Sequence, residues 1–257
     1  MKLVFIISAV FINYCAWSQD LSQTNKLLNN IERAYKRIKI YEDEGRIKTF
    51  YSYKDQEFVE EKLYKIIHDQ RGNFSFTFTD SYADEEKPYY ISFKKSDHEE
   101  TGLYKAQIMD QEGEVNQKLA SFIKGMSGIS KRIINLSTSL VHQSNSERIH
   151  FKNEIRLFDK ANLLEDRIIK GESCYVLELL SSKNWNSEEY SKQRDYNSEM
   201  TLKNEKQLQS LTKKSDTIIK YFVRKTDHII IGQERETFFD NGNYVFTRYF
   251  MNPLVAF

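Results

Sequence analysis

The sequence predicts an α+β protein in which an antiparallel sheet follows an N-terminal helix and is interrupted by a second helical region. Three observations lead to this prediction. Apolar residues recur every three or four positions between residues 21 and 39, aromatic residues alternate with polar ones between residues 73 and 95, and the helical spacing returns between residues 117 and 141. Short polar turns separate many of the other apolar segments, which is typical of neighbouring antiparallel strands.

The first 18 residues have the features of a secretory signal peptide. Lys2 provides the charged start, residues 3–12 are largely apolar, and residues 16–18 form a small-x-small cleavage site. This apolar run of about ten residues is too short to span a bilayer, which needs roughly 20. We therefore expect cleavage after Ser18 and export to the periplasm of a Gram-negative bacterium. A lipid anchor at Cys15 is the alternative, but the bulky Tyr14 before it does not fit a lipobox.

The composition excludes several classes of protein. The sequence has 38 Lys and Arg residues against 37 Asp and Glu residues, so no overall field favours binding to nucleic acid. Cys174 is the one cysteine outside the predicted leader, which excludes a disulfide framework. The two prolines of the sequence argue against Pro-rich linkers. We expect residues 19–257 to form a single domain and the protein to be a monomer.

The N-terminal half is expected to contain one helix and then a meander of strands. Asp20 or Ser22 can cap the predicted helix at residues 21–39. Residues 41–45 are expected to break that helix, with Gly45 free to take a positive φ in a turn. Strands are then predicted at residues 47–53 and 58–67, at two aromatic runs on either side of a polar turn at 84–88, and at residues 103–110 and 114–117, with a turn at 111–113.

The C-terminal half is expected to return to sheet after a helical hairpin at residues 117–126 and 130–141. A weakly patterned strand is predicted at 151–157. Residues 168–169 and 174–180 flank a turn at Gly171, and residues 174–180 are apolar enough to be buried on both faces. Residues 184–216 are polar and are expected to form a surface excursion. Strands are predicted at 218–224, 228–239 and 244–251, and Asn241-Gly242 favours a type I′ hairpin turn.

Three local motifs resemble those of a known family. They are Tyr-Glu-Asp-Glu-Gly at residues 41–45, the segment 119–130 that ends in Gly-Met-Ser-Gly-Ile-Ser, and Gly-Glu-Ser-Cys-Tyr-Val at residues 171–176. With the order of elements, they resemble the LolA/LolB lipoprotein-carrier superfamily, and more narrowly its exported LolA-like members of unknown function. The resemblance implies a strongly curved, incomplete β-barrel lidded by the N-terminal helix and a mid-chain helical plug, with a concave face that holds acyl chains or other apolar cargo. Two features depart from the carriers: no residue matches those at the barrel mouth, and the polar excursion is long.

The aromatic face of the predicted sheet is the candidate binding surface. A sheet with such a face exposes several hundred square ångströms of apolar surface unless helices cover it, and two or three helices cover only part of a large curved sheet. At roughly 25 cal/mol per Å², exposing the face would cost several kcal/mol. The candidate ligand-binding residues are Tyr51, Phe74, Phe76, Phe78, Ile91 and Phe93. In the alternative, the helices fill the concavity and these side chains pack in the core.

No pattern of a catalytic site is found in the sequence. The five histidines form no HxxxH or HExxH motif, and no GxSxG motif occurs. Cys174 lies among apolar residues, where a thiol packs as a small hydrophobe. We expect a non-catalytic binding protein without metal or cofactor that holds a lipid, an acyl chain or a lipidated partner, such as a lipoprotein or another envelope protein. The alternative is a structural or interaction module of the envelope whose concavity is filled.

Overall fold

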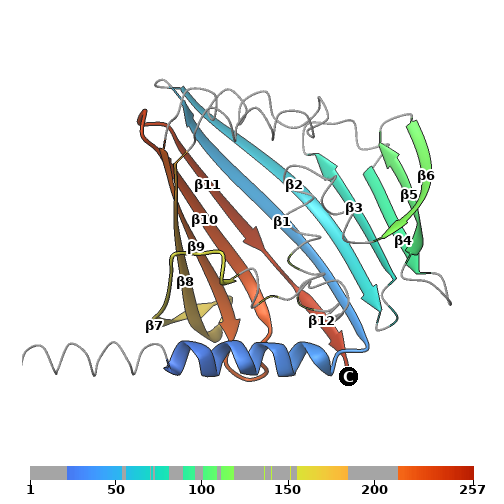
Figure 1. Cartoon of the computed structure of the whole chain (residues 1–257), viewed down its shortest axis with the longest axis horizontal. Helices are drawn as coiled ribbons and strands as arrows, with labels where there is room; N and C mark the ends of the chain where they lie inside the picture. The colour runs from blue at the N-terminus through green and yellow to red at the C-terminus, as the bar shows by residue number, and fades with distance from the viewer. Residues whose placement is uncertain are drawn as a thin grey trace, which may run out of the picture.

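The computed structural model describes one helix and one continuous antiparallel sheet of twelve strands (Figure 1). It describes residues 22–53, 56–69, 71, 73–80, 89–95, 101–108, 111–118, 136, 140, 151, 155–184 and 214–257. The helix spans residues 22–36. The strands are β1 Ile40–Tyr53, β2 Gln56–Asp69, β3 Phe74–Asp80, β4 Tyr89–Lys95, β5 Thr101–Ile108, β6 Gln111–Lys118, β7 Lys160–Ile169, β8 Glu172–Asn184, β9 Lys214–Arg224, β10 Ile230–Phe239, β11 Tyr244–Phe250 and β12 Pro253–Ala256.

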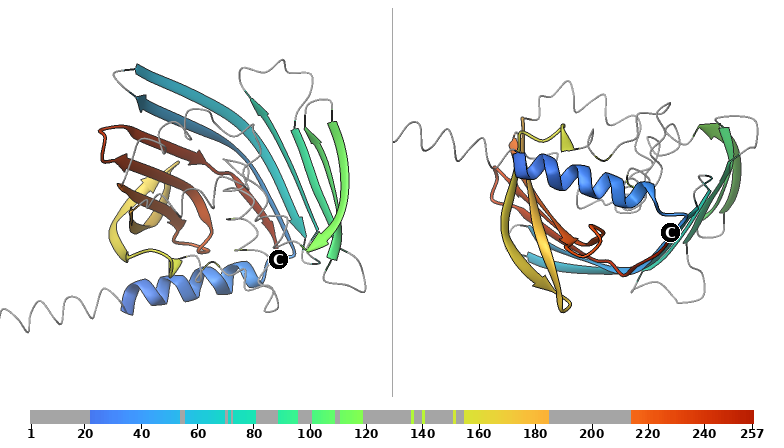
Figure 2. Two further views of the ribbon diagram at one scale, coloured as in Figure 1. Left: turned by 45° about the horizontal axis from the view of Figure 1, so that its top comes forward. Right: turned by 90° about the horizontal axis from the view of Figure 1, so that it is seen from below.

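The sheet is a strongly curved arc that does not close. Its strand order is β6-β5-β4-β3-β2-β1-β11-β10-β9-β8-β7, with β12 paired to β1. The two halves of the chain therefore meet where β1 pairs with β11, and β6 and β7 form opposite ends of the arc (Figure 2). This architecture confirms the predicted fold class of an α+β half-barrel. Of the predicted mid-chain plug, the described residues include Leu136 and Leu140, and both are helical and buried.

The two faces of the sheet differ because side chains alternate along each strand. Along β1, Tyr41, Asp43, Ile47, Thr49 and Tyr51 are buried, whereas the residues between them are exposed or half-buried. The buried side is the concave face, and the N-terminal helix lies within its hollow (Figure 2). Leu27, Leu28, Ile31, Tyr35 and Ile38 from the helix and the residue after it belong to the same core cluster as Ile47, Ile66, Phe76, Leu177, Leu179, Ile219 and Tyr221 from the sheet.

Two polar contacts hold the helix to the turn between β9 and β10. The backbone N–H of Ile230 donates to the Tyr35 hydroxyl at 3.1 Å, and the Asn30 amide nitrogen lies 3.1 Å from Nε2 of His228. His228 has a φ of 62°, which turns the chain before β10. The helix is thus fixed by polar contacts as well as by apolar burial.

Residues 41–45 are part of β1, so the predicted turn at this motif is wrong. β1 begins at Ile40, immediately after the helix region, and Gly45 does not have a positive φ. Glycine is needed here for a different reason. A Cβ at this position would lie 2.6 Å from Oη of Tyr64 and would also meet the carbonyl oxygen of Phe250. Gly45 therefore allows its two neighbouring strands to approach.

Three other local predictions are also corrected. Residues 111–113 lie in β6, so the turn predicted there is wrong, and the predicted helix at 117–126 cannot include the last two residues of that strand. Phe151 and Ile155 are helical rather than extended, and both contribute to the core. The predicted excursion ends earlier than residue 216 because β9 begins at Lys214. The remainder of the excursion, residues 185–213, lies outside the described residues.

The hairpin between β10 and β11 forms where it was predicted but with another turn type. Gly242 has a φ of 81°, whereas Asn241 does not have the positive φ that a type I′ turn requires. The N–H of Gly242 donates to the carbonyl of Phe239 at 3.0 Å, and the N–H of Phe239 donates to the carbonyl of Asn243 at 3.0 Å. This arrangement is typical of a turn followed by a left-handed residue with a bulge.

The last strand, β12, was not predicted. Arg46 pairs with Phe250 of β11, and Asp43 pairs with Pro253 of β12. The residue numbers of both pairs sum to 296, so β11 and β12 share one register and are interrupted only at residues 251–252. Four residues beginning with proline give little strand signal, although proline is tolerated at the first position of a strand.

Candidate functional site

Phe74 and Phe76, two of the predicted ligand contacts, lie in the main core. Phe74 is 4% exposed and Phe76 is fully buried. The Phe76 ring stacks on Tyr64 with centroids 6.4 Å apart, and Phe74 lies 5.3 Å from the ring of His68. The described surroundings of these two side chains are therefore those of packed core residues.

The strand register brings the remaining aromatic positions of β3 and β4 into line with these two. Phe74 pairs with Phe93, and Phe76 pairs with Ile91. Phe78 follows two residues after Phe76, opposite Tyr64 of β2, so the backbone places all five positions in rows on the same face. The side chains of Phe78, Ile91 and Phe93 lie outside the described part of the structure. Their contact with a ligand stays a prediction.

Tyr51 lies at the opposite end of the concave face from the other predicted contacts. It pairs with Phe58, whereas Phe76 pairs with Ile66, which is 66 − 58 = 8 residues farther along β2. Eight residues of strand extend for roughly 26 Å. Tyr51 instead forms a small cluster with Phe239 and Val245. The structure therefore does not bring Tyr51 together with Phe74 and Phe76.

A polar row separates these two apolar regions. Glu60, Thr49, Thr247 and Arg235 are paired across β2, β1, β11 and β10 on the concave side. The two threonine hydroxyls lie 3.3 Å apart and are buried. Glu60 accepts a hydrogen bond from Tyr51 at 3.1 Å and pairs with Lys62 at 2.8 Å. The alternation of β1 and β2 could have placed these polar residues on the inner face, but the pairing of β1 with β11 could not be read from the sequence.

A buried carboxylate lies below this row. Asp43 is 1% exposed; its oxygens accept from the Tyr64 hydroxyl at 2.6 Å and from the backbone N–H of Asn252 at 2.7 Å. Burial raises the pKa of Asp43 to about 6, although both hydrogen bonds and the nearby Lys170 charge oppose the shift. The carboxylate replaces a ladder partner at the interruption between β11 and β12. Its role in this geometry is structural, because buried polar groups require partners.

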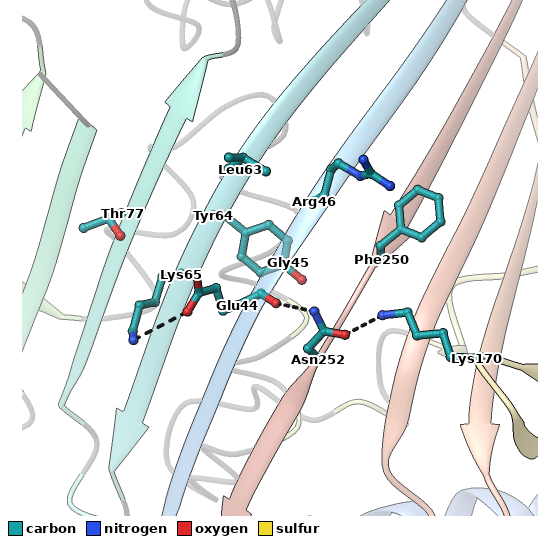
Figure 3. Close-up of a pocket in the computed structure, with 10 residues that line it drawn as sticks. All are labelled: Glu44, Gly45, Arg46, Leu63, Tyr64, Lys65, Thr77, Lys170, Phe250 and Asn252. Atoms are coloured by element: carbon teal, nitrogen blue, oxygen red, sulfur yellow. Dashed lines mark hydrogen bonds and ion pairs between the residues drawn. The ribbon is translucent and has the colours of Figure 1, made fainter. Parts of the chain in front are cut away.

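The outer face of the sheet has an open depression of about 650 Å³ at the same interruption (Figure 3). Its lining includes Arg46, Lys65, Lys170, Phe250 and Asn252. Lys170 comes from the turn between β7 and β8, where it has a φ of 52°, and it reaches the segment between β11 and β12. No sequence pattern predicted this site, because it depends on contacts between segments far apart in the chain.

The described residues show no arrangement typical of a metal centre or of an activated thiol. Within them, no three His, Cys, Asp or Glu side chains are grouped so that they could hold a metal ion. Cys174 is buried among Val176, Phe222 and Ile231, and burial raises the pKa of its thiol. A raised pKa disfavours the thiolate that nucleophilic chemistry requires. Cys174 is thus placed as a core residue.

The helices of the described residues include none that is both long and apolar enough to cross a bilayer. No family model and no curated protein matches the sequence. Solved structures similar to this chain include a LolA superfamily protein from Nitrosomonas europaea, with 10% identity over 91% of this chain and 94% of the other and a TM-score of 0.31. The lipoprotein LppX of Mycobacterium tuberculosis has 6% identity, coverage of 90% and 94% and a TM-score of 0.41, and LprF from Mycobacterium bovis has 10% identity, coverage of 90% and 92% and a TM-score of 0.40. These matches agree with the LolA-like resemblance expected from the sequence.

Proposed function

We propose that this protein is a non-catalytic binding protein of the periplasm that holds a lipid, an acyl chain or a lipidated partner protein in the hollow of its curved sheet. The observation that carries the proposal is the open arc itself. Its end strands β6 and β7 do not pair, and the N-terminal helix stops short of β4, β5 and β6 (Figure 2). An apolar concave surface of this kind suits acyl chains.

The proposed contacts are the aromatic and aliphatic positions of β3 and β4, together with Tyr51 of β1. In this structure Phe74 and Phe76 are buried, so a ligand at these positions takes the place of side chains that now cover them. That exchange involves little loss of hydrophobic stabilisation, because one apolar surface replaces another at a similar value of roughly 25 cal/mol per Å². The proposed ligand-binding residues are Tyr51, Phe74, Phe76, Phe78, Ile91 and Phe93.

Two measurements test the proposal directly. Native mass spectrometry of the protein purified from its own host is expected to show a bound lipid, and a fluorescent fatty acid is expected to bind the delipidated protein with saturation. A protein that carries no lipid and does not bind the fluorescent fatty acid would contradict the proposal.

A matched pair of variants locates the ligand on the concave face. Phe74→Leu changes a concave side chain, whereas Phe246→Leu changes a half-buried phenylalanine that stacks on Phe50 on the outer face, with centroids 5.9 Å apart. Both substitutions replace an aromatic side chain with a smaller apolar one, so both proteins are expected to fold. Fatty-acid affinity should fall in the first variant and stay unchanged in the second. Equal affinities in all three proteins would place the ligand elsewhere.

A second candidate function is an interaction module of the envelope whose concavity is filled. It is favoured by the full burial of Ile31, Ile66 and Phe76, which shows that the protein's own side chains cover this part of the concave face. Under this function the protein binds no fatty acid, and deletion of residues 185–213 abolishes binding to a protein partner while the fold persists. Fatty-acid binding that survives the deletion would instead favour the carrier function.

A further inference from the structure

We propose that the depression on the outer face of the sheet binds an oxyanion, a phosphate group above all, between Arg46 and Lys170. Figure 3 shows these two side chains at the same side of the depression, beside Phe250 and Asn252. The site lies across the sheet from the concave face. It is therefore independent of the proposed lipid-binding function and can hold whether or not that function is correct.

Lys170 is held in the depression by neutral acceptors. Its ammonium group donates to the carbonyl oxygen of Met251 at 2.9 Å and to Oδ1 of Asn252 at 2.5 Å. Asn252 is itself fixed, because its amide nitrogen donates to the carbonyl of Glu44 at 3.0 Å. Among the described residues, no carboxylate forms an ion pair with Lys170. An ammonium group has three donors, so one remains available after these two hydrogen bonds.

Arg46 is held by the neighbouring ring and also keeps available donors. Its guanidinium lies over the Phe250 ring at 4.9 Å from the centroid, and its Nη1 donates to Glu61 at 3.3 Å. The side chains of this ion pair are 49% and 31% exposed, so the pair is weak in water. A guanidinium has five N–H donors in a planar fork, which suits carboxylate and phosphate groups. In the described part of the chain, one of these donors is used.

The charges around the two groups favour a bound anion. The pKa of Lys170 is lowered mainly by partial burial and also by the positive charge of Arg46, although Asp43 opposes the shift. The two cations therefore lie close enough to repel one another, and an oxyanion between them would relieve this repulsion. Lys65 does not contribute in the same way, because it pairs with Glu42 at 2.5 Å and with Glu44 at 3.8 Å.

Titration with inorganic phosphate tests the site. At constant ionic strength and against chloride, wild-type protein is expected to bind phosphate, as observed by shifts of backbone amide signals in NMR spectra. Lys170→Gln and Arg46→Gln should each weaken binding by about tenfold, which corresponds to the loss of one charge-assisted hydrogen bond. Lys48→Gln is the matched control, because Lys48 is on the outer face of β1 but lies over Phe50, 5.2 Å from its centroid, outside the depression.

A conservative variant separates binding from folding. Lys170→Arg retains the positive charge and should retain most of the phosphate affinity, and the melting temperature of each variant shows whether it is folded. The proposal is overturned if wild-type protein does not distinguish phosphate from chloride, or if both glutamine variants bind phosphate as the wild-type protein does.

Vesicle sedimentation then identifies the source of the phosphate. If the natural ligand is a lipid headgroup, wild-type protein should bind phosphatidylglycerol vesicles but not phosphatidylcholine vesicles, and Lys170→Gln should abolish that binding. If phosphate binds and neither vesicle does, the site accepts a free phosphate compound. Both outcomes support the oxyanion site, whereas phosphatidylglycerol binding that is equal in wild-type protein and in the folded glutamine variants contradicts its use for lipid headgroups.

Discussion

Gly45 lies where the sheet leaves no room for a side chain. Its substitution by alanine would bring a Cβ against the Phe250 carbonyl and the Tyr64 hydroxyl, so we expect Gly45→Ala to lower the free energy of unfolding by about 3 kcal/mol. Gly171→Ala is the control for backbone strain alone, because Gly171 has a φ of 81° but open space around it. That variant should lose about 1–2 kcal/mol. Urea unfolding measures both, and a smaller loss at Gly45 than at Gly171 would contradict the steric explanation.

Tyr35 and Tyr41 are both buried but differ in what their hydroxyls contact. The Tyr35 hydroxyl accepts the N–H of Ile230, whereas the Tyr41 hydroxyl has no hydrogen-bond partner among the described residues. Tyr35→Phe leaves a buried N–H unsatisfied and should cost about 1–3 kcal/mol of unfolding free energy. Tyr41→Phe removes an unpaired polar group and should be neutral or stabilising. Equal losses in the two variants, measured by urea unfolding, would show that the Tyr41 hydroxyl has a partner.

At the scale of elements, the interruption between β11 and β12 is held together by side chains. Asp43 accepts the N–H of Asn252, and the Asn252 amide donates to the carbonyl of Glu44. Side chains thus replace the ladder hydrogen bonds that two residues of the strand do not make. The same interruption places Lys170 and Arg46 around the outer depression, so a local irregularity of the sheet creates the site.

The buried carboxylate at this interruption predicts a dependence of stability on pH. The pKa of Asp43 is about 6 in the folded protein and 3.8 ordinarily, so the folded state holds more protons between these values. The free energy of unfolding should therefore fall as the pH rises from about 4 to about 6, by about 3 kcal/mol from this group, and change little above that.

The variant Asp43→Asn isolates this effect. Asparagine does not titrate, and its amide can still accept from Asn252 and donate toward Tyr64. The difference in unfolding free energy between wild-type protein and the variant should shrink or reverse between pH 4 and pH 6, as followed by urea unfolding at several pH values. Parallel curves over that range would show that Asp43 does not titrate there.

At the scale of the whole molecule, the proposed ligand should stabilise the folded state. The arc is open between β6 and β7, and only the folded protein presents its concave face. A fatty acid at about 100 times its dissociation constant should raise the free energy of unfolding by about 2.7 kcal/mol. Thermal unfolding with and without the fatty acid measures this effect. An unchanged melting temperature in the presence of a saturating ligand would contradict binding to the folded state.

Much of the fold could be predicted because it depends on local patterns. Alternation of aromatic and polar residues located β3 and β4, the spacing of Leu27, Leu28 and Ile31 located the helix, and Gly171 located a turn. Residues 41–45 could not be assigned correctly, because charged residues and a glycine are typical of turns when no partner strand is known. Their place in β1 depends on β2, β11 and β12, which lie before and after them in space but far away in sequence.

The candidate binding residues show the same division. The shared face of Phe74, Phe76 and the residues opposite them followed from a period of two. The separation of Tyr51 from this group by a polar row did not, because it depends on the length of β2 and on the register between β1 and β11. The outer depression had no signal at all, since Lys170 and Arg46 are brought together only by the arc.

The amino-acid sequence by itself determined which segments are strands, which face of each strand is apolar and that one helix packs on the sheet, because these depend on neighbours within a few residues. Only the tertiary structure decided that the sheet remains an open arc, that Asp43 is buried at an interrupted strand and that two distant cations share one depression. Those features depend on the pairing of segments as many as 210 residues apart, such as Asp43 with Pro253, and no local pattern encodes such pairings.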